Sequence, residues 1–207
     1  MYYSIIEKNT FKYTYYILFL IQLVILAISI LLLLNIFNTS YLFKDSNTSS
    51  LILRIILYLF FQLVGKIVLE RKGFEQKRIY SILALISISI ILDELGYIFG
   101  WYEMGGILGI IQYDDILHFF LPMILTISLN IMFLDFLKKK NLSNILSITT
   151  LSFLISIWEI YEYWSDRILK TTMFGDIHDT ILDMTLGIFG GIIAIILLRI
   201  FKGSNNI

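Results

Sequence analysis

The hydrophobic pattern of the chain consists of long apolar runs separated by short polar segments. A membrane helix needs roughly 20 mostly apolar residues, and six runs meet this length. They cover about residues 15–37, 51–69, 79–99, 114–137, 142–164 and 179–201. One proline and 12 glycines among 207 residues favour helices with few interruptions. The pattern therefore predicts an all-α, polytopic transmembrane bundle of six helices, forming a single membrane domain over residues 1–207.

The composition agrees with a membrane protein and excludes several other classes. Hydrophobic residues make up 58% of the sequence and charged residues 15%, a balance that a soluble protein of this size cannot keep out of water. The absence of cysteine excludes disulfides, thiolate metal sites and thiol nucleophiles. The first apolar run is too long for the core of a signal peptide and lacks a small-residue cleavage site. We therefore expect it to be retained as a helix.

Basic residues are distributed unequally between the two ends of the predicted helices. If the N-terminus is cytoplasmic, 12 of the 16 Lys and Arg residues lie at or near the inner face. The exceptions are Lys44, Arg54, Arg167 and Lys170. Because short cytoplasmic loops carry an excess of basic residues, we predict that both termini are cytoplasmic. The protein is then a multi-pass protein of a prokaryotic plasma membrane.

Acidic residues gather on the opposite, outer side, which the rule for basic residues does not require. Eight of them lie within the predicted helices: Asp93, Glu94, Asp114, Asp115, Glu159, Glu162, Asp179 and Asp183. Residues three or four apart share one face of a helix. Three such sets occur, namely Asp114 or Asp115 with His118, Glu159 with Glu162 and Asp166, and Asp179 with Asp183. Because successive helices alternate in direction, four helices are predicted to present carboxylates in one layer.

Helix capping explains only part of this acidic pattern. An Asp at a helix start binds free N–H groups and suits the helix dipole, which accounts for Asp114 or Asp179. Capping does not account for Glu159 and Glu162, which lie near a C-terminal end, or for the deeper Asp183. An acid within a membrane helix costs a few kcal/mol and usually faces a cavity or a partner. With few bases nearby, some of these carboxyls must be protonated or balanced by a bound cation.

Carboxylates with imidazole and without sulfur suit Mg²⁺, Mn²⁺, Ca²⁺, Zn²⁺ or iron. The predicted metal ligands are Asp114, Asp115, His118, Glu159, Glu162, Asp179 and Asp183. The predicted catalytic groups are His118, Glu159 and Glu162, with His118 or a Glu as the proton carrier. His178 is a second candidate imidazole, although its place in a loop of mixed residues equally favours surface exposure.

A family resemblance rests on three strings of the sequence: YDDILHF at residues 113–119, WEIYEYWSD at 158–166, and GDIHDTILDM at 175–184 followed by GIFGG. Over about Asp93–Arg199, the chain resembles the YjdF-like family of small multi-pass membrane proteins, a domain family of unknown function. More distantly, it is similar to VanZ-like membrane proteins. The resemblance implies shared polar positions at Asp114, His118, Glu159, Glu162, Asp176, Asp179 and Asp183, and it supplies no activity.

The leading hypothesis is an outward-facing, divalent-metal-dependent enzyme that acts on a lipid or an envelope precursor. The metal would polarise a phosphoryl or carbonyl oxygen or activate water. One alternative is a non-catalytic partner or sensor that holds a structural ion. Another is a cation or proton transporter, although the inner half of the helices offers few polar residues beyond Gln62 and Asn130. Membrane lipids are the expected partners and nucleic acid is not, whereas substrate, metal and oligomeric state stay open.

The charge distribution generates a prediction about topology. Because the sequence contains no cysteine, single cysteines can be introduced and labelled with a membrane-impermeant reagent in intact cells. Cysteines within residues 38–50, 100–112 and 165–178 should be labelled, and a cysteine at Ser204 should react only after the cells are opened. Labelling of position 204 in intact cells would contradict the predicted cytoplasmic C-terminus.

Overall fold

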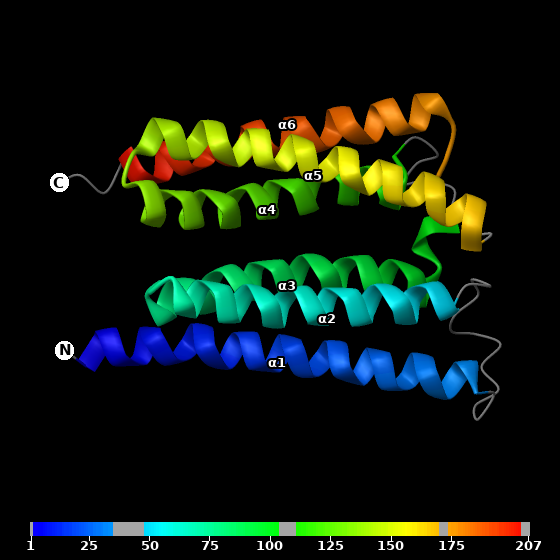
Figure 1. The fold of residues 1–207 in the computed structure, drawn as a ribbon, viewed down its shortest axis with the longest axis horizontal. Helices are drawn as coiled ribbons and strands as arrows, with labels where there is room; N and C mark the ends of the chain where they lie inside the picture. Colours follow the sequence, from blue (N-terminus) through cyan, green and yellow to red (C-terminus); the bar gives the residue numbers. More distant parts are fainter. Residues whose placement is uncertain (1, 35–47, 104–110, 170–173, 204–207) are drawn as a thin grey trace. The chain divides into compact units, whose positions relative to one another are not determined.

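The structure is a computed structural model that describes residues 2–34, 48–103, 111–169 and 174–203. Within these ranges the architecture is all-α, as predicted (Figure 1). The elements are α1 (Tyr2–Leu33), α2 (Thr48–Arg71), α3 (Gln76–Phe99), the 3-10 helix η1 (Trp101–Glu103), α4 (Tyr113–Leu137), α5 (Lys140–Leu169) and α6 (Ile177–Gly203).

All six α-helices are long and apolar enough to cross a membrane, which confirms the predicted number of spans. All six extend beyond the predicted apolar runs at one or both ends, most of all α1, which begins at Tyr2, and α5, which ends at Leu169. A helix satisfies its own backbone hydrogen bonds, so it can continue past the segment that hydropathy detects. The expected end of the first helix at residues 35–37 lies outside the described residues. The cytoplasmic placement of both termini stays a prediction.

Short turns with left-handed backbone make successive helices antiparallel. Gly73, with a φ of 75°, lies in the turn between α2 and α3. Lys138, with a φ of 55°, ends α4 by donating its N–H to the Leu134 carbonyl at 3.0 Å. Connections this short allow little except an antiparallel neighbour.

The contacts divide the chain into two compact units, Met1–Gly105 and Gly106–Ile207. In unit 1, α1 packs against both α2 and α3, and α2 also contacts α3. In unit 2, α4 packs against both α5 and α6, which also contact each other. Figure 1 shows the three helices of each unit lying side by side. The expectation of one membrane domain over residues 1–207 stays a prediction.

Polar side chains are buried in these helices, while large apolar side chains point outward. On α1, Gln22 and Ser29 are 0% exposed, whereas Leu20 is 59% exposed. On α5, Ser147 is fully buried and Phe153 is 64% exposed. This arrangement is the reverse of that in a water-soluble protein. It is stable when the surrounding solvent is hydrocarbon.

Glycines of α6 allow this helix to approach α4 and α5 closely. Gly190 lies directly against the backbone carbonyl of Phe119 on α4, so a Cβ there would clash with the oxygen. A Cβ at Gly187 would come within 2.6 Å of Ile155 Cδ1 on α5. Small residues permit such crossings, which hold membrane helices together through close van der Waals packing.

This crossing generates a prediction with a matched control. The Gly190→Ala substitution places a methyl group against a backbone oxygen that cannot rotate away, so we expect a loss of about 1–3 kcal/mol of stability. Gly65 lies within α2, and a methyl group added to it would meet no atom within 4 Å. Gly65→Ala should therefore be neutral or stabilising by up to about 1 kcal/mol. Thermal melting in detergent measures both, and equal effects would contradict the close crossing.

Candidate metal centre in unit 2

The start of α4 explains the separate roles of two adjacent aspartates. Gln112 precedes the helix, and its backbone N–H donates to the Asp115 carboxylate at 2.8 Å. This contact is half of a capping box, which satisfies an N–H that has no partner within the helix. Asp115 is therefore used to begin the helix. Asp114, one position earlier, remains available to face His118 one turn further along.

The start of α6 is also capped by an aspartate. Asp176 lies just before the helix and accepts the Asp179 N–H on its Oδ1 at 2.9 Å. The cap is thus Asp176, whereas the sequence favoured Asp179. Gly175 makes room for this arrangement, because a Cβ there would collide with the Asp179 carboxylate. As a result, the carboxylates of Asp179 and Asp183 are not needed to cap α6.

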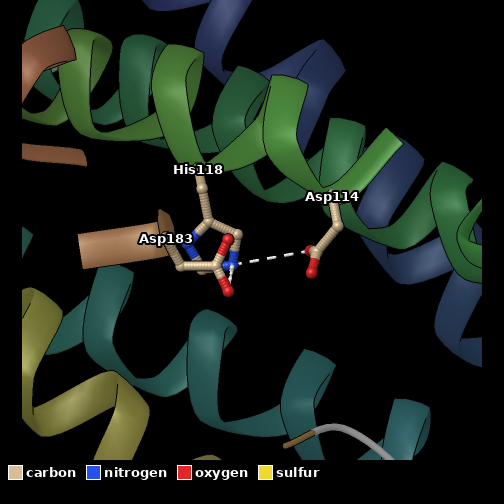
Figure 2. A group of neighbouring side chains, drawn as sticks. All are labelled: Asp114, His118 and Asp183. Carbon is tan, nitrogen blue, oxygen red and sulfur yellow. Dashed lines mark ion pairs between the residues drawn. The ribbon is translucent and has the colours of Figure 1, made fainter. Parts of the chain in front are cut away.

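His118 lies between two carboxylates from different helices (Figure 2). Its Nε2 is 3.5 Å from Asp114 Oδ1 on α4 and 3.8 Å from Asp183 Oδ2 on α6. One ligand atom from each of these three residues lies within 4.8 Å of the others. The Asp183 side chain is 4% exposed, that of His118 13% and that of Asp114 33%. The group is therefore mostly enclosed, with access from the side of Asp114.

Helix α5 adds two glutamates to this group. Glu159 is 6% exposed and interacts electrostatically with His118, Asp114 and Asp179. Its Oε1 is buried and has no hydrogen-bond partner among the described residues. Glu162 also acts electrostatically on His118, and its Oε1 accepts a hydrogen bond from Trp158 Nε1 at 2.9 Å. The described carboxylates around one imidazole thus come from all three helices of unit 2.

The structure separates the predicted site residues into three groups. Asp114, His118 and Asp183 form the tight group, with Glu159, Glu162 and Asp179 around it. Asp115 caps α4, and His178 is exposed in the first turn of α6. Asp93 and Glu94, which the sequence placed in the same layer, belong to unit 1.

Thr180, which the sequence pattern does not distinguish, has a buried hydroxyl with no hydrogen-bond partner among the described residues. The residue lies about one helical turn before Asp183. Its backbone N–H donates to the Asp176 carbonyl at 3.0 Å. A threonine in the first turn of a helix has an ordinary capping or packing role, so the residue type gave no signal.

The site holds more acidic side chains than its one imidazole can neutralise. The carboxylates of Asp114, Glu159, Glu162, Asp179 and Asp183 all lie within electrostatic reach of His118. Even a doubly protonated imidazole supplies a single positive charge. Buried carboxylates that exceed the available positive charge require protons or a bound cation. Neighbouring ligands of one divalent ion lie roughly 3–4 Å apart, and the separations of 3.5 Å and 3.8 Å at His118 fit this range.

Comparison with known proteins agrees with the family resemblance of the sequence. The family described as "Predicted membrane protein (DUF2238)" matches residues 8–204. This range is wider than the segment Asp93–Arg199 that suggested a YjdF-like family, and it is consistent with that suggestion. No curated protein and no solved structure matches the chain. The chain therefore belongs to this family of predicted membrane proteins.

Proposed function

We propose that unit 2 binds a divalent cation through Asp114, His118 and Asp183, and that this metal activates a lipid or an envelope precursor. The observation that supports the proposal is the excess of carboxylates around one imidazole. Two buried oxygens, Asp183 Oδ1 and Glu159 Oε1, have no hydrogen-bond partner among the described residues. Such atoms are costly in a protein interior. A cation held by Asp183 would offset the excess negative charge and satisfy the unpartnered Asp183 oxygen, which leaves Glu159 available to carry a proton.

The residues present would give the metal an open coordination sphere. Three protein ligands leave positions for water or substrate, as in catalytic rather than structural metal sites. The bound metal would polarise a phosphoryl or carbonyl oxygen or lower the pKa of a bound water. Glu159 is the best-placed proton carrier, because it lies near His118 and its Oε1 is not held by another described group. Glu162 is oriented by Trp158 and adds negative charge at the site.

The surroundings of the site favour a substrate that approaches from the bilayer. Trp164 on α5 is 55% exposed and Ile181 on α6 is 59% exposed. Both lie in the segments that carry the site acids, where a membrane protein meets lipid and the interfacial headgroups. A lipid-linked phosphate or ester combines an apolar anchor with an oxygen that a divalent ion polarises. This combination is the reason for preferring a lipid-class substrate.

Metal binding to the folded state is the first testable consequence. At 100 times its dissociation constant, a ligand stabilises the folded state by about 2.7 kcal/mol, so a bound metal should raise the melting temperature by roughly 5–10 °C. Mg²⁺, Mn²⁺, Ca²⁺ and Zn²⁺ are each compared with a chelator in detergent. His118→Ala should abolish the gain. His178→Ala, which changes the other histidine of the chain, should retain it.

The metal-dependent stabilisation should also weaken as the pH is lowered, because the ligands bind metal in their deprotonated forms. Elemental analysis of the protein purified without chelator identifies the metal. Identical melting curves with all four metals and with chelator would rule out the metal site and leave a polar network that needs no ion.

Catalysis requires a separate experiment, since a structural ion would give the same melting curves. Purified protein is incubated with a total lipid extract and the stabilising metal, and the lipids are profiled by mass spectrometry. We expect a product that depends on the metal and is lost in Asp183→Asn. Metal binding without any lipid product would favour a non-catalytic ion-holding module. Metal movement into sealed vesicles would favour a transporter.

A further inference from the structure

A second polar centre lies in unit 1, where a buried arginine and aspartate form a pair. Arg54 on α2 is 4% exposed, and its Nη1 is 3.9 Å from Asp93 Oδ1 on α3. Tyr58 and Tyr102 donate hydroxyl hydrogen bonds to the two Asp93 oxygens at 3.2 Å and 2.7 Å. Burial raises the pKa of the Tyr102 hydroxyl well above its usual range, so this residue stays a donor. The charge of Asp93 is therefore matched and its oxygens are occupied.

The next residue along α3, Glu94, has no such compensation. Its side chain is 0% exposed, and neither carboxylate oxygen has a hydrogen-bond partner among the described residues. The charged neighbour that acts on it electrostatically is Asp93, which repels an ionised Glu94. An ionised, unpaired carboxylate in this position would cost several kcal/mol. The single positive charge of Arg54 cannot balance both acids.

The register of α1 against α3 indicates which residue of α1 lies at the level of Glu94. Tyr15 packs against Tyr80 with ring centroids 5.9 Å apart. Seven residues further along each helix, Gln22 and Ser87 are joined through Gln62, with hydrogen bonds of 2.8 Å on both sides. The two helices run in the same direction, so adding seven more residues to each keeps them in register. This places Ser29 of α1 at the level of Glu94 of α3.

Ser29 favours a carboxylic acid over a carboxylate at this level. The Ser29 hydroxyl is fully buried and donates to the Ile25 carbonyl at 2.9 Å. With its proton committed, the hydroxyl oxygen can accept a further hydrogen bond but cannot donate one. A carboxylic acid brings its own proton to such an acceptor, whereas a carboxylate needs a donor. Among the described residues, the ionisable group that acts on Glu94 is Asp93, which in turn faces Arg54, Tyr58 and Tyr102.

We propose that Glu94 is a proton-binding site inside unit 1, distinct from the metal centre proposed for unit 2. In this site one proton adds to a Glu94 carboxylate oxygen and gives a neutral carboxylic acid. A metal ion is less suitable there, because hard cations take several oxygen ligands. Asp93 is already occupied by Arg54 and two tyrosines. Among the described residues, the group of three metal-ligating side chains found within reach of one another lies in unit 2.

Further polar groups lie where α1, α2 and α3 meet. The interface holds Tyr80, Gln62 and Ser87 in addition to Ser29. At the far end, Tyr16 and Tyr80 share a 3.3 Å contact between hydroxyls, with Lys66 Nζ 5.9 Å from both rings. The part of the interface that continues from Glu94 is therefore polar rather than entirely apolar.

Infrared spectroscopy of the purified full-length protein tests the proposal, because a protonated carboxylic acid has a C=O stretch that a carboxylate lacks. At neutral pH the wild-type protein should show this band, and Glu94→Gln should lose the part of its intensity that one carboxylic acid contributes. Glu70→Gln is the matched control in the same unit, since Glu70 is part of a partly exposed pair with Lys66. This control should keep the full band. The wild-type protein labelled with carboxyl-¹³C glutamate provides a test without any substitution, because the Glu94 band should then shift.

Three results would overturn the proposal. The first is a wild-type protein with no glutamate-derived band at neutral pH. The second is a band that persists unchanged in Glu94→Gln. The third concerns spectra recorded separately in choline, sodium and potassium chloride. A band that is present in choline chloride and absent in sodium or potassium chloride would assign Glu94 to a monovalent metal cation. The expected spectra are the same in all three salts.

Discussion

The exclusion of water from the surroundings of the helices is the constraint on which the rest of the structure depends. Hydrocarbon cannot accept or donate hydrogen bonds, so polar side chains turn inward, where a partner can satisfy them. Gln62 does so by donating to Gln22 and accepting from Ser87. Asn130 on α4 donates to Asn144 on α5 at 2.8 Å. These contacts orient the helices, because moving either partner outward would leave an amide in lipid.

The same constraint makes close backbone packing the means of holding α4 to α6. Burial of apolar surface gives little driving force when lipid is as apolar as the side chains. Gly190 lies against the Phe119 carbonyl, and Asp183 lies seven residues before Gly190 on the same face of α6. His118 is next to Phe119 in α4. The glycine crossing therefore sets the distance between His118 and Asp183 in the candidate metal centre.

Buried charge is neutralised differently in the two units. In unit 1, Arg54 and Asp93 neutralise each other, and two tyrosines occupy the remaining acceptor sites of the carboxylate. Glu94 is then a single additional acid, which one proton makes neutral. In unit 2, several carboxylates act on His118, and one imidazole cannot balance them. A multiply charged cation suits the second case, and a proton suits the first.

The sequence alone determined the six helices, because the length of an apolar run must match the thickness of a bilayer. It also showed which residues share a helical face, since that follows from the helical period. Only the tertiary structure decided which of these faces turn inward. It assigned capping to Asp115 and Asp176, left Asp114 to face His118, and paired Arg54 with Asp93. The physical reason is that periodicity gives angles within one helix, whereas the rotation of a helix against its neighbours depends on packing between residues far apart in sequence.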